Sequence, residues 1–460
     1  MLDKNLVRDV LSAALSTGGS FAEIFAENTV TNGVTLINNK VERAQSAIDY
    51  GVGIRIFDGI NAVYAYTNDT SRDNLIKVAK EAAGAVKERS NRAVNDFAVL
   101  NFDKISPVKT AYNTVNKKTI VDMLRQAGTA AFATHELVTQ TSCNYVDVST
   151  DVLIANSDGL WVEDTRNRTR TGVSAVASSA NEKQSANRGP GAQKGFEFYD
   201  TIDFAAMGRD VAEEAVKMLS AGYAPSGKMD VVIDNGFGGV IFHEACGHSL
   251  EATGVAKKAS EFWDKKGTLI ANPIVTAIDD GTLPGEWGTQ NIDDEGGASR
   301  RNVLIKDGIL NTFMIDKLNG LRMGEESTGS GRRQNYRFAP TSRMTNTYIA
   351  AGTSKRDDII SATEYGLYAK RMGGGSVQPA TGDFNFMVLE AYMIRGGKIA
   401  EPVRGASLIG KGSQVLQNID MISDDMTMEQ GMCGSMSGSI PTNVGQPLLR
   451  VKDILVGGRS

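Results

Sequence analysis

The chain has 460 residues and a formal net charge of −5, an acidic balance that argues against a general nucleic-acid-binding protein, because such proteins usually carry a basic surface. Its 41% of hydrophobic and 22% of charged residues exclude a disordered chain, and its three cysteines are too few for a disulfide framework at this length. No run approaches the roughly 18 apolar residues of a transmembrane helix, so we expect a soluble, cytoplasmic protein without a membrane anchor.

The first half of the chain alternates helices with short strands, as expected for helices packed on an antiparallel sheet. Asp58-Gly59 is a hairpin turn inside the alternating segment 51–67. Helices are predicted from the N-terminus to about Gly18 and at 71–89, 118–135 and 203–221. Strands are predicted at 22–29, 33–37, 41–46, 137–148, 151–156, 159–165 and 168–180, a connection at 91–112, and a mobile polar loop at 181–195.

The second half begins with a buried strand at 229–234, followed by a helix from about Gly238 to Glu251. Short glycine-punctuated segments follow, as in a mostly antiparallel β domain. They lie at 274–280, 301–315, 346–351, 383–395, 397–401 and 447–457. We therefore predict an α+β protein with an N-terminal domain over 1–225, a sub-boundary near 91–112, and a C-terminal domain over 226–460 that carries the helix.

The predicted helix contains the motif HEACGH, in which His243 is followed by Glu244 and His248 comes five positions after His243. In the familiar zinc-protease motif the histidines are four apart on one helix face, with glutamate as the base. At five apart, a regular helix would separate the two rings by about 140°. A one-residue bulge of the π type would bring them together, and Gly247 would make such a distortion inexpensive. The alternative is a core helix with two hydrogen-bonded histidines.

A catalytic zinc site usually has three protein ligands and a water, so a third ligand has to come from elsewhere. Cys433, in the glycine- and serine-flanked segment EQGMCGSMSGS, can present a thiolate from a loop. Cys246 lies inside the motif and is the other candidate, although a buried free cysteine is commonly just a small apolar side chain. Cys143 lies in a predicted strand and His135 near a helix end, and we expect neither to bind metal.

Other polar clusters give weaker signals. Five acidic residues in glycine-rich segments are expected to cap turns, with binding of a hard cation as the alternative. The pair Arg332 and Arg333 is suited to gripping a carboxylate or phosphate, and either arginine or Tyr336 is a candidate oxyanion donor. Gly373-Gly374-Gly375 is either a turn or a place where a peptide backbone approaches closely. The five acidic residues are Asp279, Asp280, Asp293, Asp294 and Glu295.

Several longer segments together resemble one known family. They are GVGIRIFDG (51–59), HEACGHSLE (243–251), DDGTLPGEWGTQNIDDEG (279–296), TGSGRR (328–333), PTSRMTNTY (340–348), YAKRMGGGSV (368–377), EAYMIRGGK (390–398), RGASLIG (404–410) and MCGSMSGSIPTNVGQPLLRV (432–451). This set resembles the TldD/PmbA family of metal-dependent peptidases, on its TldD side; the family is also described as modulators of DNA gyrase.

The resemblance implies zinc bound by His243, His248 and Cys433, with Glu244 as the catalytic base; Fe²⁺ is not excluded by these ligand types. It implies hydrolysis of unfolded or leader-type peptides, and a homodimer or a heterodimer with a PmbA-type sister chain. No membrane and no direct nucleic-acid partner is expected. The rival interpretation is a non-catalytic peptide-binding or gyrase-modulating protein with a structural metal, but such a site prefers four protein ligands.

Overall fold

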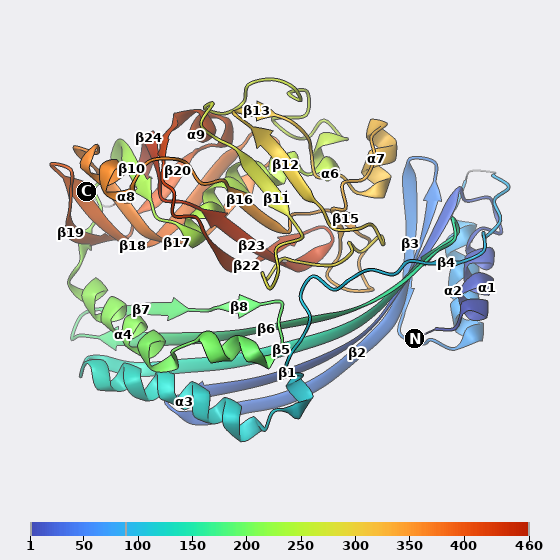
Figure 1. The fold of residues 1–460 in the computed structure, drawn as a ribbon, viewed down its shortest axis with the longest axis horizontal. Coiled ribbons are helices and arrows are strands. Elements are labelled where there is room, and N and C mark those ends of the chain that lie inside the picture. The colour runs from blue at the N-terminus through green and yellow to red at the C-terminus, as the bar shows by residue number, and fades with distance from the viewer. Residues whose placement is uncertain (1, 88–89, 459–460) are drawn as a thin grey trace.

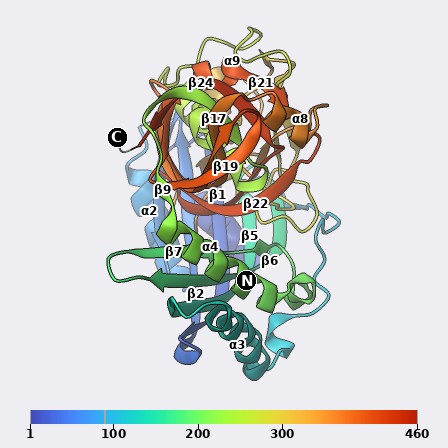
Figure 2. The same cartoon turned by 90° about the vertical axis from the view of Figure 1, so that its left-hand side faces the viewer.

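The computed structural model describes residues 2–87 and 90–458. A long curved sheet from the first half of the chain lies beneath a β-rich body formed by the second half (Figure 1). Helices cover the face of the sheet that points away from this body, at both of its ends (Figures 1 and 2). The expected α+β class, with helices packed on an antiparallel N-terminal sheet and a mostly antiparallel C-terminal part, is confirmed.

The N-terminal sheet consists of long, mainly antiparallel strands. They are β1 (Phe21–Ile37), β2 (Lys40–Asp58), β3 (Asn61–Thr67), β4 (Ala98–Val99), β5 (Val138–Asn156), β6 (Leu160–Ser178), β7 (Lys183–Arg188) and β8 (Gly191–Ala192). Their order is β3-β2-β1-β5-β6-β4, with β7 and β8 also paired to β6. The helices of this half are α1 (Lys4–Ala14), α2 (Arg72–Gly84), α3 (Lys117–Thr134) and α4 (Phe204–Ser220), with short 3₁₀ turns η1 (Tyr112–Thr114) and η2 (Phe196–Thr201).

The two faces of this sheet have different neighbours, because successive side chains of a strand point to opposite sides. Ile24 on β1 packs with Val7 of α1 and Leu75 of α2. The next residue, Phe25, packs instead with Tyr336 of the C-terminal body. The strands are therefore buried on both sides where the body and the helices overlap.

The expected strands were too short. The segments at 22–29, 33–37 and 41–46 belong to two continuous strands, since β1 pairs residue by residue with both β2 and β5 through its polar stretch. The expected loop at 181–195 contains β7 and β8, which hydrogen-bond to β6. The helix expected at 71–89 ends at Gly84, and residues 88–89 lie outside the described part of the chain.

The C-terminal body contains two large sheets and a two-stranded sheet of β14 and β15. Its strands are β9 (Gly222–Tyr223), β10 (Gly227–Ile233), β11 (Ala277–Asp280), β12 (Arg301–Lys306), β13 (Ile309–Leu310), β14 (Gly331–Arg332), β15 (Thr341–Ser342), β16 (Asn346–Ile349), β17 (Tyr365–Gln378), β18 (Asp383–Arg395), β19 (Lys398–Arg404), β20 (Ser407–Lys411), β21 (Ile419–Ile422), β22 (Thr427–Ser435), β23 (Gly438–Gln446) and β24 (Leu449–Gly457). Its helices include α6 (Ala252–Val255), α7 (Lys317–Met323), α8 (Arg356–Ser361) and α9 (Gly412–Asn418).

One sheet runs β17-β10-β24-β20-β18-β19-β9, and pairing of β17 with β18 closes its first five strands into a ring. The other runs β13-β12-β11-β16-β23-β22, which leaves β22 at its edge. The sequence analysis missed β17, β22 and β23, because glycine-rich segments are typical of loops, whereas here neighbouring strands supply their hydrogen bonds. The glycines 373–375, expected as a turn or a close approach, lie in β17 where its register with β18 shifts. None of the described helices is long and apolar enough to cross a membrane.

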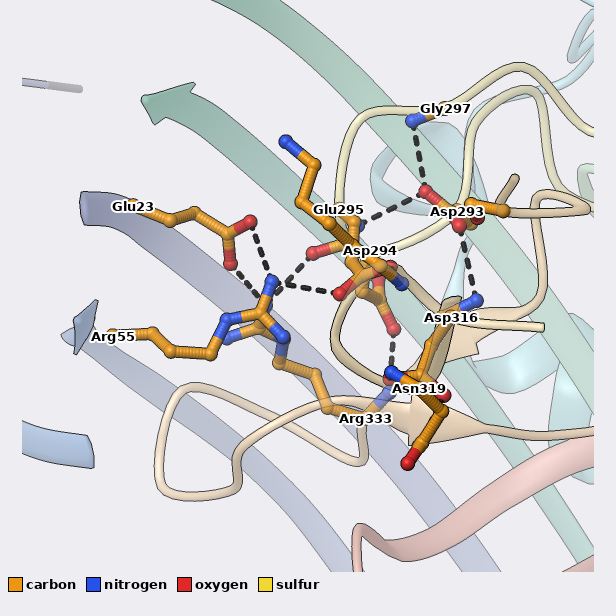
Figure 3. A network of polar contacts seen from close by, with 12 residues as sticks. Glu23, Arg55, Asp293, Asp294, Glu295, Gly297, Asp316, Asn319 and Arg333 are labelled. Atoms are coloured by element: carbon orange, nitrogen blue, oxygen red, sulfur yellow. Dashed lines mark hydrogen bonds and ion pairs between the residues drawn. The ribbon is translucent and has the colours of Figure 1, made fainter. Parts of the chain in front are cut away.

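A buried network of charges joins the N-terminal sheet to the body (Figure 3). Arg55 on β2 forms ion pairs with Glu23 at 2.8 Å and with Glu295 at 2.7 Å. Arg333 forms a second ion pair with Glu23 at 2.8 Å, and its amide donates to Asp294 at 2.7 Å. Burial alone would raise the pKa of Glu23, but the charges of Arg55 and Arg333 outweigh it and lower that pKa.

The acidic residues of 279–295 thus have structural partners, and two of them cap turns as expected. Asp293 accepts the amides of Glu295 and Gly297, and Asp280 accepts the amide of Thr282. The remaining three are bound as well: Asp279 by Thr345 and Thr347, Asp294 by Arg166, and Glu295 by Arg55.

Replacing Arg55 with methionine is expected to lower the free energy of unfolding by about 3–5 kcal/mol, because two buried carboxylates lose their shared cation. Guanidinium denaturation of the full chain measures this change. Arg55→Lys, which keeps the charge, should lose less. The control is Arg72→Met, whose partner Asp9 is solvent-exposed and whose loss should cost under about 1 kcal/mol. Equal midpoints for Arg55→Met and Arg72→Met would contradict a stabilising role of the network.

Candidate metal centre

The two motif histidines lie on one irregular helical segment. It begins as the 3₁₀ turn η3 (Gly236–Gly239), continues as α5 (Val240–Phe242) and the π-helix η4 (His243–Gly247), and ends as the 3₁₀ turn η5 (His248–Leu250). The amide of His248 donates to the carbonyl of His243, an i→i+5 bond that places the two residues one above the other. The predicted π-type bulge between the histidines is confirmed.

The glycines of this segment are needed for close packing. Gly247 has ordinary helical dihedral angles, so the expectation that it eases the distortion by its conformational freedom was wrong. A Cβ atom at Gly247 would lie 2.5 Å from the sulfur of Met344, and one at Gly239 would lie 2.5 Å from the backbone of Gly445 in β23. The segment can therefore approach the sheet of β22 and β23 closely.

Cys433 reaches the histidines from β22. Its sulfur lies 3.2 Å from Nε2 of His243 and 3.2 Å from Nε2 of His248. These three ligand atoms lie within 4.8 Å of one another, the one such group of three in the described part of the chain. The expectation that Cys433 lies in a loop was wrong: it is paired with Ile440 of β23, and the hairpin holds its side chain toward the helix.

The other candidate ligands lie elsewhere. Cys246 is fully buried in the apolar core, and its sulfur faces the carbonyl of Gly412 at 3.7 Å. Burial raises the pKa of this thiol well above its ordinary value, as in the alternative that treats it as a small apolar side chain. Cys143 is buried in β5, and the Nδ1 atom of His135 accepts the amide of Leu137 at the end of α3.

The charges at the site favour a thiolate. Burial would raise the pKa of the Cys433 thiol, but the charge and hydrogen bonds of His243 and His248 outweigh it and lower that pKa to about 3. For His248, burial would lower the pKa, but the carboxylate of Glu251 and the sulfur of Cys433 raise it well above its ordinary value. A deprotonated sulfur between two imidazoles is a metal-ligating arrangement.

Two side chains that the sequence analysis did not single out support the ligands. Glu251 lies 3.2 Å from Nδ1 of His248, which orients the ring so that Nε2 points at the sulfur. Arg343, fully buried, donates to the carbonyls of Cys433 and Gly438, and its Nε lies 3.6 Å from Glu251. The position of Glu251 three residues after His248 was a usable signal; the sequence carries none for Arg343.

Glu244 lies at the edge of the same cluster. Its Oε2 is 3.8 Å from Nε2 of His248, and its side chain is 20% exposed, so water can reach it. Burial raises the pKa of this carboxyl above its ordinary value, despite the opposing charges of His243 and His248. A more basic carboxylate beside the ligand atoms is suited to accepting a proton from water.

The candidate oxyanion donors are engaged elsewhere. The hydroxyl of Tyr336 donates to Asp49 at 3.3 Å. Arg333 pairs with Glu23, and Arg332 donates to the carbonyl of Met344. The structure thus offers no support for Tyr336, Arg332 or Arg333 in that role.

The donor set fits a divalent transition metal. Two imidazole nitrogens and a thiolate are typical ligands of catalytic zinc and leave room for water in a fourth position. At ordinary zinc–ligand distances and a tetrahedral angle, each nitrogen would lie about 3.5 Å from the sulfur. The observed 3.2 Å requires only a small expansion.

Comparison with known proteins gives a consistent match along the chain. The sequence matches the PmbA/TldA metallopeptidase C-terminal domain over residues 226–458, the central domain over 111–219 and domain 1 over 22–86. A protein named metalloprotease TldD homolog from Haemophilus influenzae is 36% identical over 95% of this chain and 93% of its own. A protein named zinc metalloprotease TldD homolog from Saccharolobus solfataricus is 24% identical over 97% and 99%.

The fold has been seen before in crystals. A Thermotoga maritima protein whose suggested role is modulation of a DNA gyrase matches with a TM-score of 0.81 at 19% identity, over 99% of this chain and all of its own.

Proposed function

Because the chain belongs to the PmbA/TldD family of metallopeptidases, we propose that it is a zinc-dependent peptidase whose metal is held by His243, His248 and Cys433, with Glu244 as general base. The observation that carries the proposal is the convergence of two Nε2 atoms on a low-pKa thiol beside a basic carboxylate. Zinc is favoured by this donor set and by the name of the Saccharolobus relative; Fe²⁺ accepts the same ligand types.

In the proposed peptide hydrolysis, the side chains at the site have separate roles. When bound, the metal polarises the scissile carbonyl and acidifies water. Glu244 takes the proton of the attacking water at its carboxylate and passes it to the leaving amine. Glu251 keeps the Nδ1 atom of His248 occupied, and Arg343 holds the backbone of Cys433 in place.

The substrate is proposed to be an unfolded or leader-type peptide in an extended conformation. Cys433 lies on β22, the edge strand of its sheet, and Met432 and Gly434 next to it are exposed. An edge strand can accept a peptide as a further strand through main-chain hydrogen bonds, with little dependence on side chains. A peptide on this edge passes directly beside the candidate metal ligands.

The partner is proposed to be a second copy of the chain or a PmbA-type sister chain. Among the residues that the structure describes, the first part of β2, from Lys40 to Tyr50, pairs only with β1, and it is largely exposed, including Ile48 at 69% and Tyr50 at 51%. An exposed strand edge, here with both polar and apolar side chains, can pair with another chain. The cytoplasm remains the proposed location, since the three cysteines are free.

We expect this peptidase to cleave an unfolded protein but not the folded form of the same protein, because only an extended chain can lie along an edge strand. The experiment compares proteolysis of a small folded protein with that of a destabilised point mutant, with and without the sister chain of the source organism. Equal cleavage of both forms would contradict the extended-peptide site. Cleavage of neither under any pairing would favour the non-catalytic, gyrase-modulating alternative.

A further inference from the structure

A cavity of about 410 Å³ lies between the N-terminal sheet and the hairpin of β22 and β23. Its walls include Val148 of β5, Trp287, and Met432 with its cross-strand partner Pro441. Met432 directly precedes Cys433, whose side chain points to the opposite face of the hairpin. The cavity is therefore one residue away from the proposed metal site along β22.

Arginines form much of this cavity's polar wall. Arg166, Arg168 and Arg170 alternate along β6, so all three point from the same face of the sheet, and Arg332 joins them from the body. Arg166 is paired with Asp294 at 2.5 Å. The other three have no carboxylate partner within the part of the chain that the structure describes.

These three arginines make their direct contacts with neutral groups. Arg168 donates to the carbonyls of Trp287 at 3.0 Å and Thr289 at 2.8 Å. Arg332, only 2% exposed, donates to the carbonyl of Met344. Arg170 lies over the ring of Trp287, with its guanidinium carbon 5.9 Å from the ring centre. Carbonyl groups and the indole ring interact with these guanidinium groups but carry no negative charge.

The acidic side chains of the cavity are bound to other groups or are partly neutral. Asp294 forms an ion pair with Arg166 and accepts the backbone amide of Arg333, and Asp49 binds Arg337 at 2.6 Å and 2.9 Å. Burial raises the pKa of Glu27 to about 7, so near neutral pH much of this carboxyl is uncharged.

The arginines destabilise one another's charged form. Burial, and then the charges of Arg332 and Arg166, lower the pKa of Arg168 to about 9, against the smaller opposing charges of Asp294 and Asp164. Burial is the main cause that lowers the pKa of Arg332 to about 10; the charges of Arg343 and Arg166 lower it further, and those of Asp294 and Asp279 offset this only in part. An anion entering the cavity would relieve this repulsion.

We propose that this cavity is a specificity pocket that binds a carboxylate of the peptide substrate through Arg168, Arg170 and Arg332. The inference rests on the proposed peptidase function and adds a substrate class, a peptide with an acidic group close to the scissile bond. The planar fork of an arginine matches a carboxylate with two parallel hydrogen bonds. In a strand added to β22, alternate side chains point to the face on which Met432 lies, and so toward the arginines.

Binding of three labelled hexapeptides to the Glu244→Gln protein tests the pocket without cleavage. The first has a central glutamate and a C-terminal amide, the second has glutamine in place of glutamate with the amide, and the third has glutamine with a free C-terminal carboxylate. We expect the glutamate peptide, the free-acid peptide or both to bind at least about tenfold more tightly than the neutral one. The peptide that gains affinity identifies the source of the carboxylate.

The arginine variants are made in the same Glu244→Gln background. Arg168→Gln and, independently, the partly exposed Arg170→Gln should each reduce the preference for the acidic peptide several-fold. Arg209→Gln, an exposed change on α4, should leave it intact. Equal affinity for all three peptides, binding of none, or a preference that survives both pocket variants would overturn the pocket, whatever the parent protein cleaves. A preference that depends on Arg168 in a protein that hydrolyses no peptide would support the pocket and contradict the peptidase function.

Discussion

Glu244→Gln is expected to abolish peptide hydrolysis while leaving the metal bound. The substitution removes the carboxylate that accepts the proton of water but keeps the size of the side chain and all three candidate ligands. Loss of a general base lowers the rate by about 10²- to 10⁴-fold. Turnover of an unstructured peptide and elemental analysis of the same purified sample measure the two quantities together.

The matched control is Glu326→Gln, an exposed change in the same body that should preserve both activity and metal. Near wild-type turnover in Glu244→Gln would show that another group is the base. Loss of metal together with activity would show that Glu244 acts on the ligands, for example through His248, 3.8 Å from its carboxylate.

Cys433→Ser is expected to release the metal, from about one ion per chain to a small fraction, and to inactivate the protein. A serine hydroxyl is not deprotonated near neutral pH, so two imidazoles would remain where three ligands had been. The metal content after gel filtration against a weak chelator measures the loss. Circular dichroism of the same sample checks that the β22–β23 hairpin still folds.

Cys246→Ser provides the comparison, because this thiol lies next to the motif but faces the carbonyl of Gly412, which a serine hydroxyl can also use as an acceptor. It should keep its metal, and so should Cys143→Ser in β5. Metal lost in Cys246→Ser and retained in Cys433→Ser would overturn the assignment of the third ligand.

The local pattern of the sequence determined the unusual features of the helix. Two histidines five apart, with Glu244 after the first, require a π-type bulge if their rings are to meet, and the structure has that bulge at His243–Gly247. Alternation and turn residues likewise indicated the hairpin at Asp58-Gly59 and the α+β class. These features depend on contacts between residues close together in the chain, where spacing alone restricts the geometry.

Only the tertiary structure decided how distant segments meet. Cys433 lies 185 positions after His248, and its place on an edge strand follows from pairing with β23, which its glycine-rich sequence does not reveal. The position of Arg343 behind the ligands also follows from the tertiary structure alone. The arginines of β6 likewise line a cavity only because Met432 and Arg332, which are distant in sequence, form its other walls. Pairing between strands and burial of charge depend on partners that are far away in sequence. The sequence pattern can therefore identify candidate residues, but only the fold determines which of them lie together.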